Sequence, residues 1–277
     1  MKTYTTLLIL LFVTTLTFAQ KKEKIKGSKT VTTLHKEVGS FNALEIEDNL
    51  EIYLEKAEKN EIKIEADDNL HDIISLDLRD NTLRLYTTKT ATNFKKLIVR
   101  VRYTNDFKMV TIKNEATVNA IQEIQLNDIT FKTFDFSKLY SNVNAKNFVL
   151  QSNDKSKTEL NLKSENATIE LSKNATLKAL ITTNELKCDL YQKTSANIEG
   201  NAANANIRLD NNAILIGNKL TIKNANLTAE SYSSCSIFAE TSISIEAANK
   251  AEIQLFGTPK IEVRKFADEA KLFKKLK

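Results

Sequence analysis

The stretch that decides the fold is Asn166-Ala167-Thr168-Ile169-Glu170-Leu171, in which apolar and polar residues alternate. Alternation at period 2 is typical of a short β-strand with one buried face. The Asn-Ala element returns at Asn174-Ala175, Asn204-Ala205, Asn212-Ala213 and Asn224-Ala225. Because one strand type recurs, with related strands about 20 residues apart, the sequence predicts stacked coils. We therefore expect an all-β protein, a single-chain parallel β-helix or β-solenoid, for which a right-handed coil is favoured.

The two cysteines, Cys188 and Cys235, fall on the apolar parity of their strands. More than two coil lengths separate them, whereas disulfide partners need Cα atoms within ~7 Å of each other. We expect both to be buried core thiols, reduced and not bonded to each other.

The N-terminus predicts export. Lys2 precedes an apolar run at residues 7–13, and small residues end at Ala19. This pattern is typical of a signal peptide over residues 1–19, because the run is too short to span a bilayer. No Cys stands at the cleavage point to carry a lipid anchor. The mature protein is expected in the periplasm, on the outer surface or in the medium.

The positive charge is concentrated near the two ends. Residues 20–36, a Lys-rich lead, carry +5 and residues 260–277 carry +4, which leaves about −5 on the body between them. Two basic tails do not form the clustered basic face that nucleic-acid binding requires. We expect no nucleic-acid partner, and membrane contact that is peripheral if it occurs.

Between the ends, the sequence predicts one solenoid domain over residues 37–263. Irregular N-terminal coils reach to about residue 113, and regular repeats cover residues 114–258. Residues 264–277 are expected to form a basic amphipathic helix that caps the solenoid, because apolar residues recur there at a spacing of three to four. These residues are Phe266, Ala270, Phe273 and Leu276. The helix would pack on an apolar surface patch formed by outward-facing Ile214, Ile216, Phe238 and Phe256.

Residues suited to catalysis or metal binding are sparse. The two histidines, His35 and His71, are too far apart in the chain to suggest a metal motif or a triad. An acidic group could bind Ca²⁺ or form a solvated turn, and its spacing favours the turn. Its members are Asp67, Asp68, Asp72, Asp77 and Asp80. We expect no catalytic, cofactor-binding or metal-binding residues.

Outward carboxylates of the coils alternate with cations. Glu170, Asp189 and Glu199 are interleaved with Lys178, Lys187 and Arg208. This pattern favours charge pairing across stacked strands. A glycosidase would instead need two carboxyl groups roughly 5–10 Å apart, one of them desolvated.

Several segments before the repeats carry a family resemblance. They are Phe41-Asn42-Ala43-Leu44-Glu45-Ile46, Asn49-Leu50-Glu51-Ile52-Tyr53-Leu54, residues 62–70 and residues 81–85. With the repeating strands, to about Gly257, they resemble the head-GIN-domain family, described as "putative autotransporter adhesins". The resemblance implies an exported bacterial β-helical protein and no catalytic residues. The chain differs from the family in having Asn-Ala and Asn-Asn where Gly-Ser-Gly corners are usual.

The sequence thus favours an exported, non-catalytic interaction protein of the adhesin type, with a surface glycan or protein as partner. A carbohydrate-active β-helix, either a glycosidase or a lyase, is the first alternative. A purely structural envelope protein is the second. A cleft holding two close carboxylates would favour the enzyme, and flat repeating faces would favour adhesion or a structural role.

Overall fold

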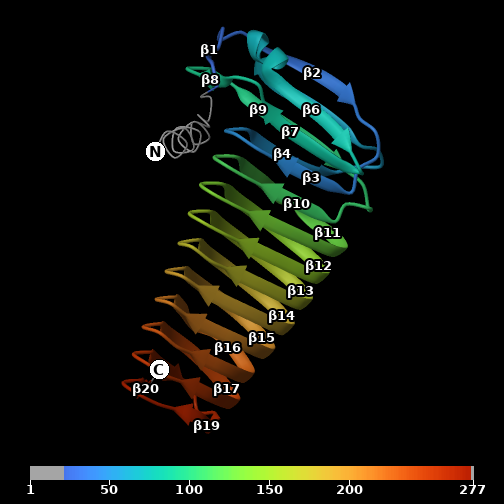
Figure 1. Cartoon of the computed structure of the whole chain (residues 1–277). Coiled ribbons are helices and arrows are strands. Elements are labelled where there is room, and N and C mark those ends of the chain that lie inside the picture. Colours follow the sequence, from blue (N-terminus) through green and yellow to red (C-terminus); the bar gives the residue numbers. More distant parts are fainter. Residues whose placement is uncertain (1–21, 276–277) are drawn as a thin grey trace, which may run out of the picture.

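The computed structural model describes residues 22–275, and the predicted signal peptide at residues 1–19 lies outside this range. The described chain is a tall column of stacked strands with a broader N-terminal end (Figure 1). Its helical content is one short 3-10 helix, η1 (Asp68–Ile73). Among residues 22–275, no helix has the length and hydropathy needed to cross a bilayer. The all-β solenoid expected from the repeats is confirmed.

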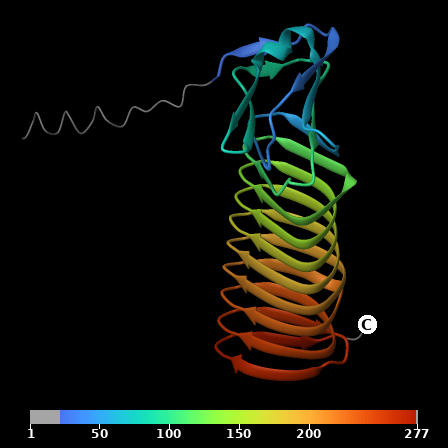
Figure 2. The same cartoon turned by 90° about the vertical axis from the view of Figure 1, so that its right-hand side faces the viewer.

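The column consists of strands that pair in parallel with the next coil. In register, Lys157 aligns with Thr176, and Thr176 with Ser195, so one coil takes 19 residues. Figure 2 shows the coils stacked edge-on. The strands are β10 (Met109–Ile112), β11 (Thr117–Thr133), β12 (Lys138–Ser152), β13 (Lys157–Leu171), β14 (Thr176–Tyr191), β15 (Ser195–Asp210), β16 (Ile214–Ala229), β17 (Ser234–Ala247), β18 (Glu252–Phe256), β19 (Lys260–Phe266) and β20 (Lys271–Lys274).

Each long strand bends once, which gives the coil two straight segments. In β13 the buried positions are even-numbered up to Leu162 and odd-numbered from Ala167 onward. The parity changes around Glu165, which is left out of the register with β14. The apolar sides of the two segments therefore face each other across the core. We call the outward side chains before the bend (residues 138–144 and those aligned with them) the first face, and those after it (residues 147–152 and those aligned) the second face.

Four-residue turns close the coils. The N–H of Ala175 donates to the carbonyl of Ser172 at 3.2 Å, and the central residues, Lys173 and Asn174, have φ of 52° and 68°. Asn211 and Asn212 also have positive φ angles in the corresponding turn two coils later. Asn tolerates the left-handed region because its short amide can bond locally. The corners therefore form without glycine.

The N-terminal end is a cap whose outer strands pair antiparallel with their neighbours. β3 and β4 continue the parallel stack on the N-terminal side of β10 and β11, with β7 and β9 beyond them. β6 then pairs antiparallel with β7, and β5 with β9 and β2. The expected irregular coils up to residue 113 are thus only partly coils. The strands are β1 (Lys24–Lys26), β2 (Val31–Glu37), β3 (Ala43–Ile46), β4 (Glu51–Lys56), β5 (Glu61–Asp67), β6 (Ile74–Arg79), β7 (Thr82–Thr87), β8 (Thr90–Thr92) and β9 (Leu97–Tyr103).

The predicted C-terminal helix is wrong, because β19 and β20 form a further coil there. Phe266 aligns with Ala247 and Phe273 with Gln254, both 19 residues earlier. Ala270 closes the same kind of turn as Ala251, through a hydrogen bond from its N–H to the carbonyl of Ala267. The spacing of three to four residues arises because these positions lie on either side of a turn. Leu276 lies outside the described residues.

The basic lead is also not a free tail where the structure describes it. β1 pairs with β8, and β2 forms seven register pairs with β5. Lys22 contacts Asp48 at 2.6 Å, and Lys89 reaches Glu23 at 2.8 Å. The positive charge of this segment is therefore partly neutralised by the cap.

Candidate functional site

The candidate carboxylates of the sequence analysis are divided between the two faces. Glu170 and Asp189 are register partners on the second face, and Lys187 lies 4.0 Å from the first and 3.1 Å from the second. Glu199 lies on the first face, where Lys219 contacts it at 3.2 Å. The structure therefore does not bring the three acids together. The adjacent pair, Glu170 and Asp189, shares one cation, Lys187.

The interleaved cations behave differently from one another. Lys187 pairs with acids of its own and the neighbouring coil, as predicted from the alternation. Arg208 lies over the ring of Tyr191, with its guanidinium carbon 5.6 Å from the ring centroid. Lys178 lies on the first face beside Glu159 and lines a groove that is described below.

The structure places both cysteines in the core. Cys188 and Cys235 are 0% and 1% exposed, and neither is in a disulfide. Burial raises the pKa of the Cys188 thiol to about 12 and also raises that of Cys235. Thiols in this protonated, enclosed state are poor nucleophiles.

The acidic group around Asp67 is dispersed by the fold. Asp67 is buried and accepts backbone N–H bonds from Lys29 at 2.8 Å and from Lys95 and Lys96 at 3.0–3.1 Å. Burial raises the pKa of Asp67, but these donors outweigh it and hold the pKa below its usual value. Asp68 bonds Ser28. In the described chain no three His, Cys, Asp or Glu side chains gather as metal ligands.

The two histidines lie apart and have separate partners. Nδ1 of His35 is 2.7 Å from Glu61, and Nε2 of His71 is 2.8 Å from Thr32 Oγ1. Each contact ties β2 to a neighbouring element of the cap. Neither ring is placed beside a candidate nucleophile.

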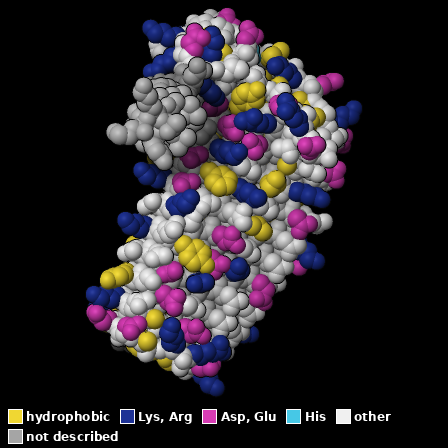
Figure 3. Space-filling model, in the orientation of Figure 1, with side chains coloured by type: hydrophobic (Ala, Val, Ile, Leu, Met, Phe, Trp, Pro, Cys, Tyr) yellow, Lys and Arg dark blue, Asp and Glu magenta, His cyan; other side chains and the backbone are white. Residues whose placement is uncertain are grey.

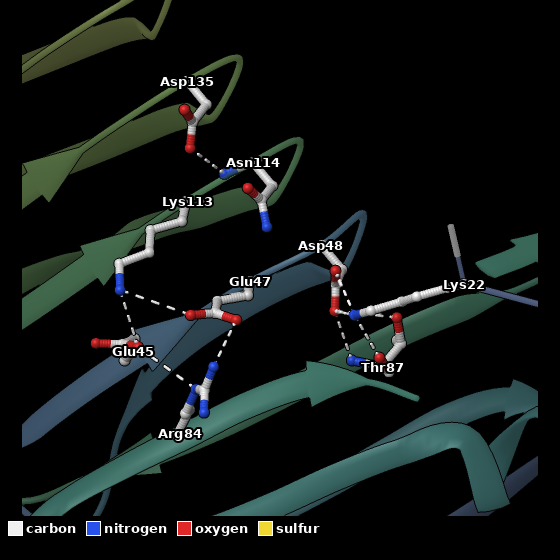
Figure 4. Close-up of polar contacts among 9 residues, drawn as sticks. All are labelled: Lys22, Glu45, Glu47, Asp48, Arg84, Thr87, Lys113, Asn114 and Asp135. Atoms are coloured by element: carbon white, nitrogen blue, oxygen red, sulfur yellow. Dashed lines mark hydrogen bonds and ion pairs between the residues drawn. The ribbon is translucent and has the colours of Figure 1, made fainter. Parts of the chain in front are cut away.

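Ion pairs cover the outer surfaces of the cap. Arg84 and Lys113 each bridge Glu45 and Glu47, with Arg84 2.8 Å from Glu47 and Lys113 3.0 Å from Glu45 (Figure 4). On the opposite side, hydrogen bonds from Lys96, then Arg100 and Lys63, hold the pKa of Glu65 at about 2. These charges already have partners, which favours a role in joining cap strands.

An amide ladder follows the second face. Asn224 donates to Asn204 at 3.1 Å, and Asn204 to Glu185 at 2.6 Å, each across one coil step. Further rungs are Asn147 to Asp128, Asn166 to Asn147, Asn226 to Asn206, and Ser242 to Asn224. A groove of about 490 Å³ lies over the C-terminal half of this ladder. The Asn-Ala motif thus includes ladder positions as well as turn positions.

A groove of about 540 Å³ lies on the first face, over β11 to β15. Two outward columns line it. One runs Tyr140, Glu159, Lys178, Asn197, and the other runs Asn142, Asn161, Leu180, Glu199. Sequence reasoning missed this groove, because alternation identifies outward residues without showing which of them are enclosed.

The grooved face ends at two irregularities of the strands. Between Ala120 and Ile124, β11 has two residues more than β12, and Ile121 is displaced outward to 65% exposure. At the other end, β16 has one residue more than β15, where Glu199 aligns with Lys219. Bulges commonly redirect side chains in this way. The two bulges lie at opposite ends of the groove, beside its lining residues Ile121 and Glu199.

The predicted apolar surface patch lies beyond the second bulge. Ile214 and Ile216 are exposed on β16, and Phe238 and Phe256 are half-buried register partners on β17 and β18. In the described part of the C-terminal segment, strands β19 and β20 stand in place of the helix that was expected to cover them. On the side drawn in Figure 3, Lys/Arg and Asp/Glu side chains are interspersed, and wide areas of the coils are neither charged nor hydrophobic.

Comparison with known proteins places these features in context. The family model for "Putative auto-transporter adhesin, head GIN domain" matches residues 40–259. A "putative adhesin" from Parabacteroides distasonis has a TM-score of 0.65 at 14% identity, and one from Parabacteroides merdae has 0.62 at 18%. A "putative lipid binding protein" from P. distasonis has 0.65 at 12%. Each alignment covers 91% of this chain and 100% of the other. No curated protein matches the chain.

Proposed function

Because the chain belongs to the head GIN domain family of adhesin-type proteins, we propose that it is exported and binds an extended partner without chemically changing it. The site of action would be the cell envelope or surface. The N-terminal sequence motivates export, through the signal-peptide pattern of residues 1–19. Antibody labelling of intact and lysed cells tests the location, and retention of the protein in the cytoplasm would contradict it.

The observation that carries the proposal is the pair of straight faces that the stacked coils present. From β12 to β17 the coils pair with their neighbours along almost their whole length. The backbone N–H and C=O groups of these strands are therefore bonded within the protein. A partner meets rows of side chains that repeat every ~4.8 Å. Such surfaces suit long ligands that are held by many weak contacts.

The arrangement of the carboxylates favours binding over hydrolysis. A glycosidase needs one carboxyl group that stays protonated and a second, nearby one that is ionised. Glu170 and Asp189 both form ion pairs with Lys187, whereas Glu199 lies on the other face and forms an ion pair with Lys219. These contacts support the non-catalytic alternative over the carbohydrate-active one.

The test incubates purified mature protein with a glycan array, soluble polysaccharides and lipid vesicles. The vesicles are included because one protein of this fold is described as lipid binding. Both retention and new reducing ends or unsaturated products are measured. We expect retention without product. Product that accumulates with turnover, and is lost in Glu170→Gln, Asp189→Asn or Glu199→Gln but not in the remote Glu58→Gln, would identify an enzyme.

A further inference from the structure

The first-face groove has unused hydrogen-bonding groups. Within residues 22–275, no hydrogen bond or ion pair engages the side chains of Glu159, Asn161, Lys178 or Asn197. On the second face, by contrast, Asn204 and Asn224 are already bonded to neighbouring coils. Together, the amide, carboxylate and ammonium groups supply both hydrogen-bond donors and hydrogen-bond acceptors. The groove can therefore satisfy a ligand that carries many hydroxyl groups.

The same groove exposes apolar surface at three points. Tyr140 is 37% exposed, Leu180 53% and Ile121 65%. Their positions in the lining place an aromatic ring and two aliphatic side chains beside the free polar groups. An aromatic side chain gives a large, rigid contact area for an apolar ligand surface. Sugar rings combine an apolar C–H face with a rim of hydroxyls, which matches this mixture.

The charge of the lining selects among possible ligands. Glu159 and Lys178 are register partners of opposite sign, and Glu199 is neutralised by Lys219 at 3.2 Å. The groove therefore offers no net charge to attract an acidic polymer. Nor can the groove bind a peptide as an added strand. It lies on the face of the sheet, whereas β-augmentation requires a free sheet edge.

We propose that this groove, between the bulges of β11 and β16, binds an uncharged oligosaccharide chain that runs along the solenoid axis. Tyr140 stacks on a sugar ring, and the four free polar side chains bond its hydroxyls. From β11 to β15 the groove crosses four coil steps, roughly 19 Å at the usual strand spacing. That length accommodates several consecutive sugar units. This inference rests on the proposed function and names its ligand class and its face.

The experiment measures retardation of the mature protein in gels containing linear neutral polysaccharides, namely glucan, mannan, xylan and galactan. Polygalacturonate serves as the acidic comparison, and phosphatidylcholine vesicles serve as the lipid one. We expect a neutral polysaccharide to retard the wild-type protein. Tyr140→Ala is expected to weaken binding about tenfold, equivalent to ~1.4 kcal/mol. Tyr140→Phe should keep most of it, because the ring remains.

The matched control is Tyr232→Ala, which removes a tyrosine that is 60% exposed at a turn outside the groove. It should bind as the wild type does, and thermal melts verify that all variants fold. Equal binding by Tyr140→Ala and wild type would overturn the groove assignment while the proposed function stands. Retention by polygalacturonate or vesicles alone would overturn the ligand class. Retardation by none of the neutral polymers would overturn the inference, whereas product formation would overturn the proposed function itself.

Discussion

The backbone of Gly200, at the bulge that ends the groove, tolerates no side chain. Its φ is 113°, and a Cβ there would lie 2.1 Å from the carbonyl oxygen of Ile181. We expect Gly200→Ala to lower the free energy of unfolding by about 2 kcal/mol or more, through backbone strain. Gly217→Ala is the control, since the closest contact to its Cβ is 3.1 Å and its φ is not positive. Urea unfolding measures both, and an equal loss would refute the strain argument.

The buried thiols predict that stability falls at alkaline pH. Burial raises the pKa of Cys188 to about 12 and raises that of Cys235. In the unfolded chain thiols lose protons above pH ~8.5, whereas in the native state they keep them, so the unfolded state binds fewer protons there. The free energy of unfolding should therefore decrease as pH rises from about 8.5.

The limiting slope is ~1.4 kcal/mol per pH unit for each thiol. Urea unfolding of the wild type and of Cys188→Ala/Cys235→Ala, between pH 8 and 10.5, measures the difference in slope. Equal slopes would contradict the argument. Native thiol titration provides a second check, because both groups should react only after denaturation. Loss of both thiols in unreduced, denatured protein would instead indicate a disulfide.

At the scale of elements, the C-terminal coil protects the coils before it. β20 pairs with β18, and β19 with β17, so Ile253 and Leu255 remain buried beneath this last rung. Deleting residues after Val263 would expose these apolar side chains and an unpaired strand edge. We expect a melting temperature lower by several degrees and lower solubility. Removing only residues 276–277 is the control, and equal behaviour of the two truncations would refute a stabilising role.

The same elements show what alternation can and cannot predict. The Asn-Ala motif predicted a repeat of about 20 residues, and the coil takes 19. The motif, however, combines two different positions of the coil. Asn174 and Asn212 lie in turns at positive φ, whereas Asn204 and Asn224 bond each other in the ladder. Apolar residues on either side of a turn are spaced three to four apart, as in a helix. Only alignment with the preceding coil distinguishes Ala270 as a turn residue.

At the scale of the whole molecule, the sequence predicted the solenoid and its buried face but not the cap or the groove. The cap strands alternate as coil strands do, so parity does not reveal that β5 runs antiparallel to β9. The groove lies between the extra residues of β11 and β16, which change register without changing composition. Its free polar groups could be recognised only once the partners of the other amides were known.

The last prediction concerns how the intact protein binds. The groove of about 540 Å³ is open to solvent and offers few strong contacts to a ligand, so monovalent binding should be weak. When several copies are linked, the first to bind holds the others near the ligand at a high effective concentration. Avidity can then exceed single-site affinity by about 10²-fold or more. We expect tetramers formed on streptavidin, through one biotin added at the C-terminus, to be retained by a surface glycan at concentrations where the monomer is not. Clustered Tyr140→Ala should lose most of this gain, whereas clustered Tyr232→Ala should keep it. Tight binding by the monomer, with no gain on clustering, would indicate a preformed high-affinity pocket instead of a repetitive adhesive surface.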